Sequence, residues 1–224
     1  TRVRSSAASD VYKRQVDRRY VFEYVRYLIG RGQVAEAHQI WSQSANLGDL
    51  SAYQPSPKNR VVNGDFMSPV LNAGFDWTYE KLSDVSLSLD PTESHAGHRS
   101  LSIIFDSRGI EDAGIRQLIP VEPNTKYEFS AYFKTQALEG AGGPRFVLED
   151  SFSSTKYFAS AELKDADIWK QVDGTFSTGA DTRLLMLRVQ RVPVGNAIRG
   201  KLWIADIRLT PSFGVQQQTV AGGQ

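Results

Sequence analysis

The sequence predicts a mainly β protein, an antiparallel β-sandwich of the jelly-roll type that follows a short N-terminal helical hairpin. From residue 58 onward, short runs alternate apolar and polar residues, are separated by turn residues and show no helical period between them. These runs span residues 85–89, 100–105, 115–121, 127–134, 145–148, 171–177, 184–189 and 201–209. Before residue 50, apolar residues instead recur every three or four positions, as in helices. A series of alternating runs without helices between them favours an antiparallel sandwich over a parallel α/β sheet.

Composition limits the class of protein. The chain has 224 residues, 41% of them hydrophobic, which is enough for one sizeable core and a small second unit. Its net charge of +1 gives no basic excess of the kind that a nucleic-acid-binding surface needs. The absence of cysteine excludes disulfides, thiolate metal sites and cysteine nucleophiles. No apolar run approaches the roughly 18 residues that a membrane-spanning helix requires.

The two ends of the chain are expected to be disordered. Residues 1–15 are polar and rich in Arg and Ser, and residues 10–15 resemble the translation of a sequencing adaptor, so this segment is interpreted as an artefact. A genuine basic disordered arm is the alternative. Residues 212–224, rich in Gln and Gly, form the second expected tail.

Residues 16–50 are expected to form two amphipathic helices interrupted at residues 30–32. Their predicted apolar faces carry Tyr20, Tyr24, Tyr27 and Leu28, and then Val34, Ala37, Ile40, Trp41 and Ala45. The second helix resembles the hairpin of a tetratricopeptide repeat. Such repeats need about three copies to bury their faces, so the resemblance implies further helices upstream in a larger bacterial protein. The alternative is a helical hairpin that packs on the sandwich.

The predicted sandwich, residues 58–211, contains five short pieces whose order and spacing resemble those of carbohydrate-binding modules of the family 4, 9 and 22 type. These pieces are residues 59–66 (NRVVNGDF), 95–101 (HAGHRSL), 121–130 (VEPNTKYEFS), 169–172 (WKQV) and 202–207 (LWIADI). The resemblance implies a jelly roll that binds a glycan in a cleft on its concave sheet, in an extracellular or cell-envelope setting. Residues 51–57, rich in Ser and Pro, are predicted to be the linker before it.

Sugar recognition requires aromatic faces for the pyranose ring and planar polar groups for its hydroxyls, so outward-facing side chains are the candidates. Tyr132 is the predicted central aromatic, because its strand places alternate residues from Tyr127 to Phe133 in the core. The other candidate ligand-binding residues are Trp77 and Tyr79 in the loop after the first strand, Gln117, Arg145, Glu149, Arg188 and Gln190. Trp169 and Trp203 are assigned to the core. Alternatively, Trp77 and Tyr132 cover the edges of the sandwich.

The resemblance also implies a structural calcium ion between the first and last strands, with Asp65 and Asp206 at the matching positions. Met67 departs from the family pattern, which has Glu at this place. The alternative is two aspartates that cap turns. His95 and His98 have a metal-like spacing, but without a third ligand they are expected to be solvated loop residues.

The sequence contains no nucleophile elbow, phosphate-binding loop or zinc-binding helix motif, so we expect a protein that is not an enzyme. The leading hypothesis is non-catalytic binding of a polysaccharide or oligosaccharide by a module at the C-terminus of a larger protein. The alternative is a sugar-blind protein-interaction or scaffolding domain of a helical-repeat envelope or assembly protein, with the N-terminal helices as a protein-binding surface. A third class, a glycoside hydrolase, would need two opposed carboxylates in the cleft.

Overall fold

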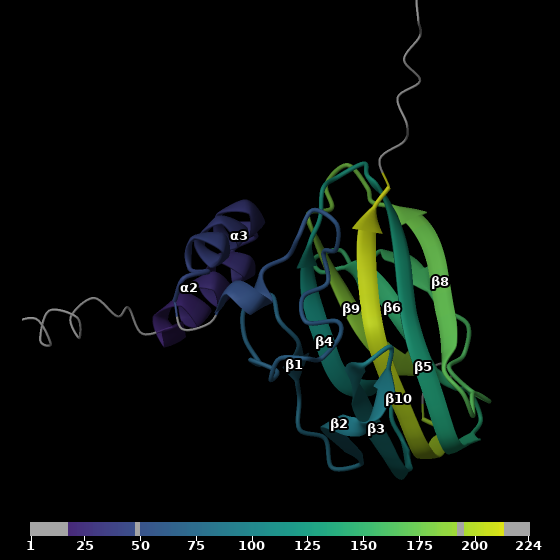
Figure 1. Cartoon of the computed structure of the whole chain (residues 1–224). Helices are drawn as coiled ribbons and strands as arrows, with labels where there is room; N and C mark the ends of the chain where they lie inside the picture. Colours follow the sequence, from purple (N-terminus) through teal and green to yellow (C-terminus); the bar gives the residue numbers. More distant parts are fainter. Residues whose placement is uncertain (1–17, 48–49, 192–194, 213–224) are drawn as a thin grey trace, which may run out of the picture.

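The computed structural model describes residues 18–47, 50–191 and 195–212, and Figure 1 shows two helices beside a β-sandwich. The helical elements are α2 (Arg18–Gly30), α3 (Val34–Gln43) and the 3-10 turn η1 (Leu50–Tyr53). The strands are β1 (Thr78–Tyr79), β2 (Val85–His95), β3 (His98–Gly109), β4 (Asp112–Pro120), β5 (Lys126–Gly140), β6 (Pro144–Asp150), β7 (Lys156–Ala159), β8 (Lys170–Ser177), β9 (Leu184–Arg191) and β10 (Ala197–Pro211). In the described part of the chain, no helix is both long and apolar enough to cross a membrane.

The strands form two five-stranded sheets, which are antiparallel wherever two strands pair. Sheet A has the order β1-β4-β9-β6-β7, and sheet B has the order β2-β3-β10-β5-β8. Apolar side chains from the inner surfaces of both sheets form one buried cluster between them. The predicted fold class, a mainly β antiparallel sandwich with two short N-terminal helices, is therefore confirmed.

Strand β5 shows how the alternating pattern produces the core. Tyr127, Phe129 and Ala131 are buried in the cluster between the sheets, as their spacing predicts. The intervening side chains point outward, and Tyr132 is one of them. Since the period of a strand is two residues, the same residues that fill the core also fix which side chains reach the outer faces.

Helix α2 buries a different face from the one predicted. Its buried residues are Val21, Val25 and Leu28. Tyr20, Tyr24 and Tyr27, which were expected on the apolar face, are exposed by 68%, 49% and 58%. Both stripes have helical spacing, and the aliphatic one packs without burying a hydroxyl group that would need a partner. The prediction for the tyrosines was therefore wrong, whereas Val34, Ala37 and Trp41 of α3 are buried as expected.

The two helices pack directly on the sandwich. A second buried cluster joins residues of α2 and α3 to Val62, Phe75 and Leu184 of the sandwich segment. The Trp41 indole Nε1 donates to the carbonyl of Tyr53 (2.8 Å), and the Tyr53 hydroxyl donates to the carbonyl of Pro69 (2.7 Å). The start of the segment predicted as a linker, around η1, is thus part of this packing. The resemblance to a tetratricopeptide repeat stays a prediction.

Gly74 permits the close approach between the helices and the sandwich. Its φ of +61° lies in the left-handed region, and a Cβ at this position would lie 2.1 Å from the ring of Trp41. Trp41 itself is fully buried and cannot swing away. The loop around Gly74 therefore fits under the Trp41 ring only because glycine has no side chain.

Candidate functional site

The two outer faces of the sandwich carry its outward-pointing polar side chains. We call the outer surface of sheet A face A; it carries Asp112, Arg116, Leu118, Arg145, Glu149, Met186, Arg188 and Gln190. We call the outer surface of sheet B face B; it carries Asp90, Ile104, Tyr132, Lys134, Lys201 and Trp203. The core cluster between the sheets contains the residues that alternate with them, which settles the assignment.

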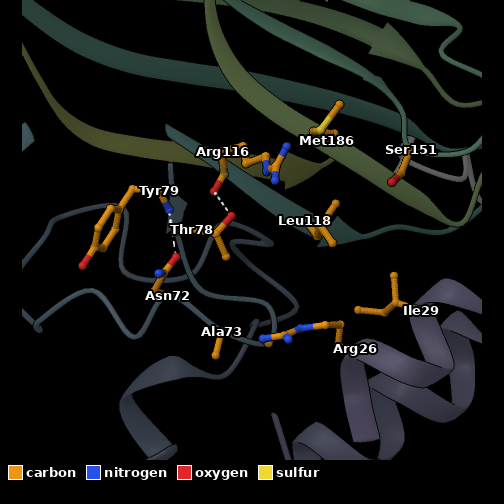
Figure 2. A pocket seen from close by; sticks show the side chains of 11 residues that line it. Arg26, Ile29, Asn72, Ala73, Thr78, Tyr79, Arg116, Leu118, Ser151 and Met186 are labelled. Atoms are coloured by element: carbon orange, nitrogen blue, oxygen red, sulfur yellow. Dashed lines mark hydrogen bonds between the residues drawn. The ribbon is translucent and has the colours of Figure 1, made fainter. Parts of the chain in front are cut away.

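Face A is hollowed by two adjoining cavities that share Arg116 and Met186. The larger one, of about 500 Å³, lies between face A and helix α2, which contributes Arg26 and Ile29 (Figure 2). The smaller one, of about 250 Å³, extends over β4 and β9 as far as Asp112. Together they form one groove, and its volume falls in the range of small-molecule and sugar-sized sites.

Arg188 is held between two carboxylates at the floor of the groove. Its Nη2 lies 3.0 Å from Oε1 of Glu149, and its Nη1 lies 3.5 Å from Oδ2 of Asp112. The strand order β4-β9-β6 places these three residues side by side across the sheet. Burial raises the pKa of Asp112, and the Gly114 N–H and the charge of Arg188 oppose that rise. The guanidinium of Arg188 is therefore fixed in position by charges from both neighbouring strands.

Arg145 and Gln190 are cross-strand partners on β6 and β9, beside the two cavities rather than within them. Arg145 donates through Nη1 to the carbonyl of Ser160 (3.0 Å) and through Nη2 to Glu162 (3.1 Å). Three buried atoms of face A lack a hydrogen-bond partner among the described residues: Nε of Arg145, Nε of Arg188 and Oε1 of Gln190. The buried polar atoms of face A that lack a partner among the described residues thus lie on β6 and β9.

Tyr79 is the aromatic residue of the predicted set that reaches the groove. It ends the short strand β1 at the edge of sheet A, is 50% exposed and lines the larger cavity. Its N–H donates to the Asn72 side chain (2.9 Å), and the neighbouring Thr78 hydroxyl donates to the carbonyl of Arg116 (3.3 Å), as Figure 2 shows. These bonds hold the rim of the groove against β4.

Two predicted ligand-binding residues are inaccessible. Trp77 is fully buried in the core, where its Nε1 donates to the carbonyl of Asn63 (3.2 Å). Gln117 is also fully buried, points inward from β4 and exchanges hydrogen bonds with the backbone of Val62 (2.8 and 3.1 Å). Both predictions were wrong for this reason: each side chain has the type that a sugar site uses but satisfies a structural contact instead.

Tyr132, the predicted central aromatic, lies on the opposite side of the molecule from Arg145 and Arg188. Strand β5 belongs to sheet B, whereas β6 and β9 belong to sheet A, so no single cleft contains all three residues. The Tyr132 ring stacks on the His95 ring at a centroid distance of 3.8 Å, and its hydroxyl donates to Gln171 (3.1 Å). The prediction of one shared cleft was therefore wrong.

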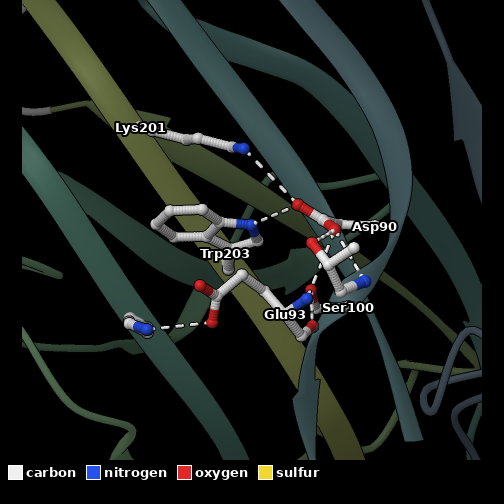
Figure 3. A network of polar contacts seen from close by, with 7 residues as sticks. Asp90, Glu93, Ser100, Lys201 and Trp203 are labelled. Carbon is white, nitrogen blue, oxygen red and sulfur yellow. Dashed lines mark hydrogen bonds and ion pairs between the residues drawn. The ribbon is translucent and has the colours of Figure 1, made fainter.

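Face B is filled by its own side chains around Trp203, as Figure 3 shows. The Trp203 Nε1 donates to Asp90 (2.9 Å), and Lys201 Nζ lies 4.3 Å from the centre of the Trp203 ring. Beside it, Lys134 pairs with Glu93 at 2.9 Å. Trp203 is only 3% exposed but lies outside the core cluster to which it was assigned, because its strand turns it outward.

Trp169 was also assigned to the core and is instead half-buried just before β8. Its ring lies 5.5 Å from the His95 ring, at the end of face B. Strand β8 is at the edge of sheet B (Figure 1). The assignment to the core was wrong because this segment precedes the strand rather than belonging to it.

The residues proposed for calcium do not fit that ion. Each carboxylate oxygen of Asp206 contacts a histidine Nδ1: that of His95 at 2.5 Å and that of His98 at 2.6 Å. One carboxylate oxygen of Asp65 accepts the N–H of Met67 (3.3 Å), so it caps a turn. Calcium takes six to eight oxygen ligands, and the described residues contain no group of three or more His, Asp or Glu side chains that could hold a metal. The two histidines are hydrogen-bond partners of Asp206 rather than solvated loop residues.

Residues 58–193, more than half of the chain, match the family described as carbohydrate binding domain, of the family 4 and 9 type. The chain belongs to this family. Among the solved structures similar to this chain is a family 4 carbohydrate-binding module, with 15% sequence identity and a TM-score of 0.50. The match covers 68% of this chain and 99% of the family 4 module.

Two further similar structures are carbohydrate-binding modules of other families. One is a family 61 module in complex with β-1,4-galactotriose, with 15% sequence identity and a TM-score of 0.48. The match covers 69% of this chain and 99% of the family 61 module. The other is the family 22 xylan-binding domain from Paenibacillus barcinonensis, with 17% sequence identity and a TM-score of 0.44. The match covers 62% of this chain and 86% of the xylan-binding domain. At these identities the likeness concerns the fold alone. No curated protein sequence matches the chain significantly.

Among the groove residues that the sequence-based prediction missed, Arg116, Met186 and Arg26 are the most informative. Arg116 follows from the alternation of β4, since it is the outward neighbour of the inward Gln117. Met186 follows from the same rule on β9. Arg26 could not be found in this way, because it comes from helix α2 and reaches the groove only through the packing of that helix on the sandwich.

Proposed function

We propose that this chain is a non-catalytic glycan-binding module whose binding site is the groove on face A. The observation that carries the proposal is the groove itself, which joins the fixed Arg188 guanidinium, the exposed Arg116 and the half-exposed Tyr79 along the floor and rim of two connected cavities. Planar polar groups and an aromatic rim are what a pyranose ring with its hydroxyls requires. Membership in a carbohydrate-binding family supports the same site class.

The charge network supports binding rather than hydrolysis. Glycoside hydrolysis uses two carboxyl groups that act as acid and base or nucleophile on opposite sides of the bond. In the groove, Glu149 and Asp112 are both paired with the guanidinium of Arg188. Carboxylates that share one arginine serve to position it, so the non-catalytic function fits this arrangement best. The place of the module at the C-terminus of a larger bacterial protein stays a prediction.

The test is a calorimetric titration of the full chain with xylo-, cello-, manno- and galacto-oligosaccharides, repeated on a variant whose groove is filled. Met186 is common to both cavities, so Met186→Trp is expected to abolish binding. The matched control is Ile104→Trp, which adds the same side chain on face B. Binding that survives Met186→Trp, or that is lost equally in Ile104→Trp, would contradict the proposed site.

One observation favours the alternative function, a sugar-blind protein-interaction domain. Tyr20, Tyr24 and Tyr27 form an exposed stripe along α2, and the rings of Tyr24 and Tyr27 stack at 6.4 Å. Exposed aromatic side chains of this kind are enriched at protein interfaces. If this stripe binds a second copy of the chain, sedimentation will show a dimer that a Tyr20→Ser, Tyr24→Ser, Tyr27→Ser variant loses. Glycan binding by a monomer would rule the alternative out.

A further inference from the structure

Among the described residues, the larger cavity of the groove is lined by two positively charged side chains and by no negatively charged one. Arg26 comes from helix α2 and Arg116 from β4, on opposite sides of the cavity, and Figure 2 shows both. The remaining lining residues are apolar or neutral and polar, including Asn72, Tyr79 and Met186. The cavity is therefore a basic pocket in a chain whose overall charge is close to zero.

Arg26 of helix α2 and Arg116 differ from Arg145 and Arg188 of face A in having no ion-pair partner among the described residues. Arg188 pairs with Glu149 and Asp112, and Arg145 pairs with Glu162. Arg26 and Arg116 are exposed, and their guanidinium groups form no ion pair or hydrogen bond with a described residue. Their charge is thus available to a ligand in the cavity.

The neutral residues of the same cavity also present donors. The Asn72 side-chain oxygen accepts the N–H of Tyr79, which leaves the Asn72 amide group as a donor at the rim. Guanidinium groups bind carboxylate and sulfate through paired, charge-assisted hydrogen bonds, which are about twice as strong as neutral ones. A donor-rich cavity with two unpaired arginines is complementary to an anionic group on a sugar.

The second cavity indicates the direction in which a ligand would lie. Its lining includes three acidic residues, Glu80, Glu111 and Asp112, together with Arg188 and the shared Arg116, so this end of the groove is less positive than the α2 end. An anionic group is therefore attracted more strongly to the α2 end. This difference in charge would orient a glycan that carries its anionic group on one residue.

We infer that the groove selects acidic glycans, with the carboxylate of a uronic acid or a sulfate group held between Arg26 and Arg116. The inference rests on the proposed function and names the ligand class of that same site. Helix α2 then contributes directly to recognition, since it supplies one of the two arginines. The N-terminal helices are part of the binding site in this assignment, not only a neighbouring unit.

The test compares ligands that differ only in charge, with the full chain as the protein. Trigalacturonate is titrated beside its methyl ester, and xylo-oligosaccharides with a glucuronic acid branch beside the unbranched ones; sulfated and unsulfated galacto-oligosaccharides form the third pair. We expect at least one acidic member to bind about tenfold or more tightly than its neutral partner in low salt. We expect this preference to fall steeply as salt is raised.

Variants decide whether the two arginines are responsible. Arg26→Gln and Arg116→Gln should each reduce the preference, and the double variant should abolish it while neutral glycans still bind. Arg199→Gln is the matched control, because Arg199 is an exposed arginine of β10, in sheet B, that pairs with Glu139 and lines neither cavity. Equal binding of acidic and neutral partners, or a preference that survives the double variant, would overturn the inference and leave the proposed function standing. Failure of every glycan, neutral or acidic, would overturn both.

Discussion

Face A and face B are built from the same number of antiparallel strands and differ in how they accommodate charge. On face A, the carboxylates of Glu149 and Asp112 pair with Arg188. Beside them, Arg116 and, from helix α2, Arg26 line the larger cavity without an ion-pair partner among the described residues. On face B, Asp90 and Lys201 surround Trp203, and polar and aromatic side chains fill the surface. Face A is thus shaped to receive a ligand, whereas face B completes its own interactions.

The cause of this difference lies outside the sheets. Helix α2 and the loop at residues 72–74 stand over one end of face A and enclose the larger cavity. Face B has no helical cover in the described part of the chain (Figure 1), and the side chains around Trp203 contact one another instead. A separate cavity of about 430 Å³ lies at the end of β10, where the loop at residues 58–68 walls sheet B. Helix α2 thus gives face A a cavity that the centre of face B lacks. Four predictions test this comparison, in order of decreasing effect.

The largest expected effect is on the pH dependence of the free energy of unfolding. Its sign is opposite for Asp76, near face A, and for Asp90, on face B. Asp76 lies in the loop beside face A, and burial raises its pKa from 3.8 to about 7. Hydrogen bonds from Leu71, Trp77 and Asn63 oppose this rise. The unfolded chain then releases its proton at lower pH than the folded one, so stability falls as pH rises from about 4 to 7, by up to about 4 kcal/mol. Asp76→Asn should flatten this fall in urea unfolding measured between pH 4 and 7.

Asp90 on face B provides the contrast. The Trp203 indole N–H, with further donors from Thr92 and Glu93, lowers the pKa of Asp90. Its contribution to stability is therefore present above the unfolded pKa near 4 and is lost as pH falls further. Asp90→Asn should lower the free energy of unfolding at neutral pH and remove the fall on the acid side, without changing the fall between pH 4 and 7. If the Asp76→Asn variant still loses stability between pH 4 and 7, the assignment of that loss to Asp76 is contradicted.

The second prediction concerns the buried ion pairs of face A. Arg188→Met removes the partner of the buried Glu149 carboxylate, and we expect a loss of about 3 kcal/mol in the free energy of unfolding. Adding Glu149→Gln should restore part of it, since no unpaired charge then remains. At the end of β3 in sheet B, Arg108→Met breaks the exposed pair with Asp84 and should cost less than about 1 kcal/mol. Equal losses at the two sites would show that face A is not desolvated.

The third prediction concerns the helices that wall face A. Gly74→Ala places a Cβ against the Trp41 ring at a positive φ, and we expect a loss of about 2 kcal/mol from overlap and backbone strain. Gly97→Ala is the control, because Gly97 also has a positive φ (+83°) but its Cβ would meet nothing within 4 Å. Denaturation followed by tryptophan fluorescence should show the larger loss for Gly74→Ala. Similar losses would mean that backbone strain alone acts at both positions.

The smallest expected effect is a difference in glycan affinity between variants of Tyr79 and Tyr132, the two tyrosines predicted to bind sugar. Tyr79→Ala should weaken binding of the glycan identified in the titrations about fivefold, because a stacked aromatic ring contributes about 1 kcal/mol. Tyr132→Ala should leave affinity unchanged, since its ring lies on face B against His95. Calorimetry with one ligand measures both. A loss of binding in Tyr132→Ala alone would move the site to the opposite face.

The candidate site could be predicted in part, and the errors have definite physical causes. The alternation of β9 correctly places Arg188 and Gln190 on one outer face. On β4 the prediction chose Gln117, one residue away from Arg116, and a shift of one residue in a strand turns a side chain to the other face. Trp77 was chosen for its chemistry, but burial of a large aromatic in the core stabilises the fold more than its exposure would.

By itself, the sequence determined the class of the fold and the inward side of most strands, because burial of apolar side chains with a period of two is a local pattern. It also determined the family, through motifs that are mainly turn and core residues. Only the tertiary structure decided that β5 and β9 lie in different sheets, which separates Tyr132 from Arg188. It alone placed Arg26 opposite Arg116. Such contacts depend on strand order and helix packing, which arise from interactions between distant parts of the chain rather than from any local periodicity.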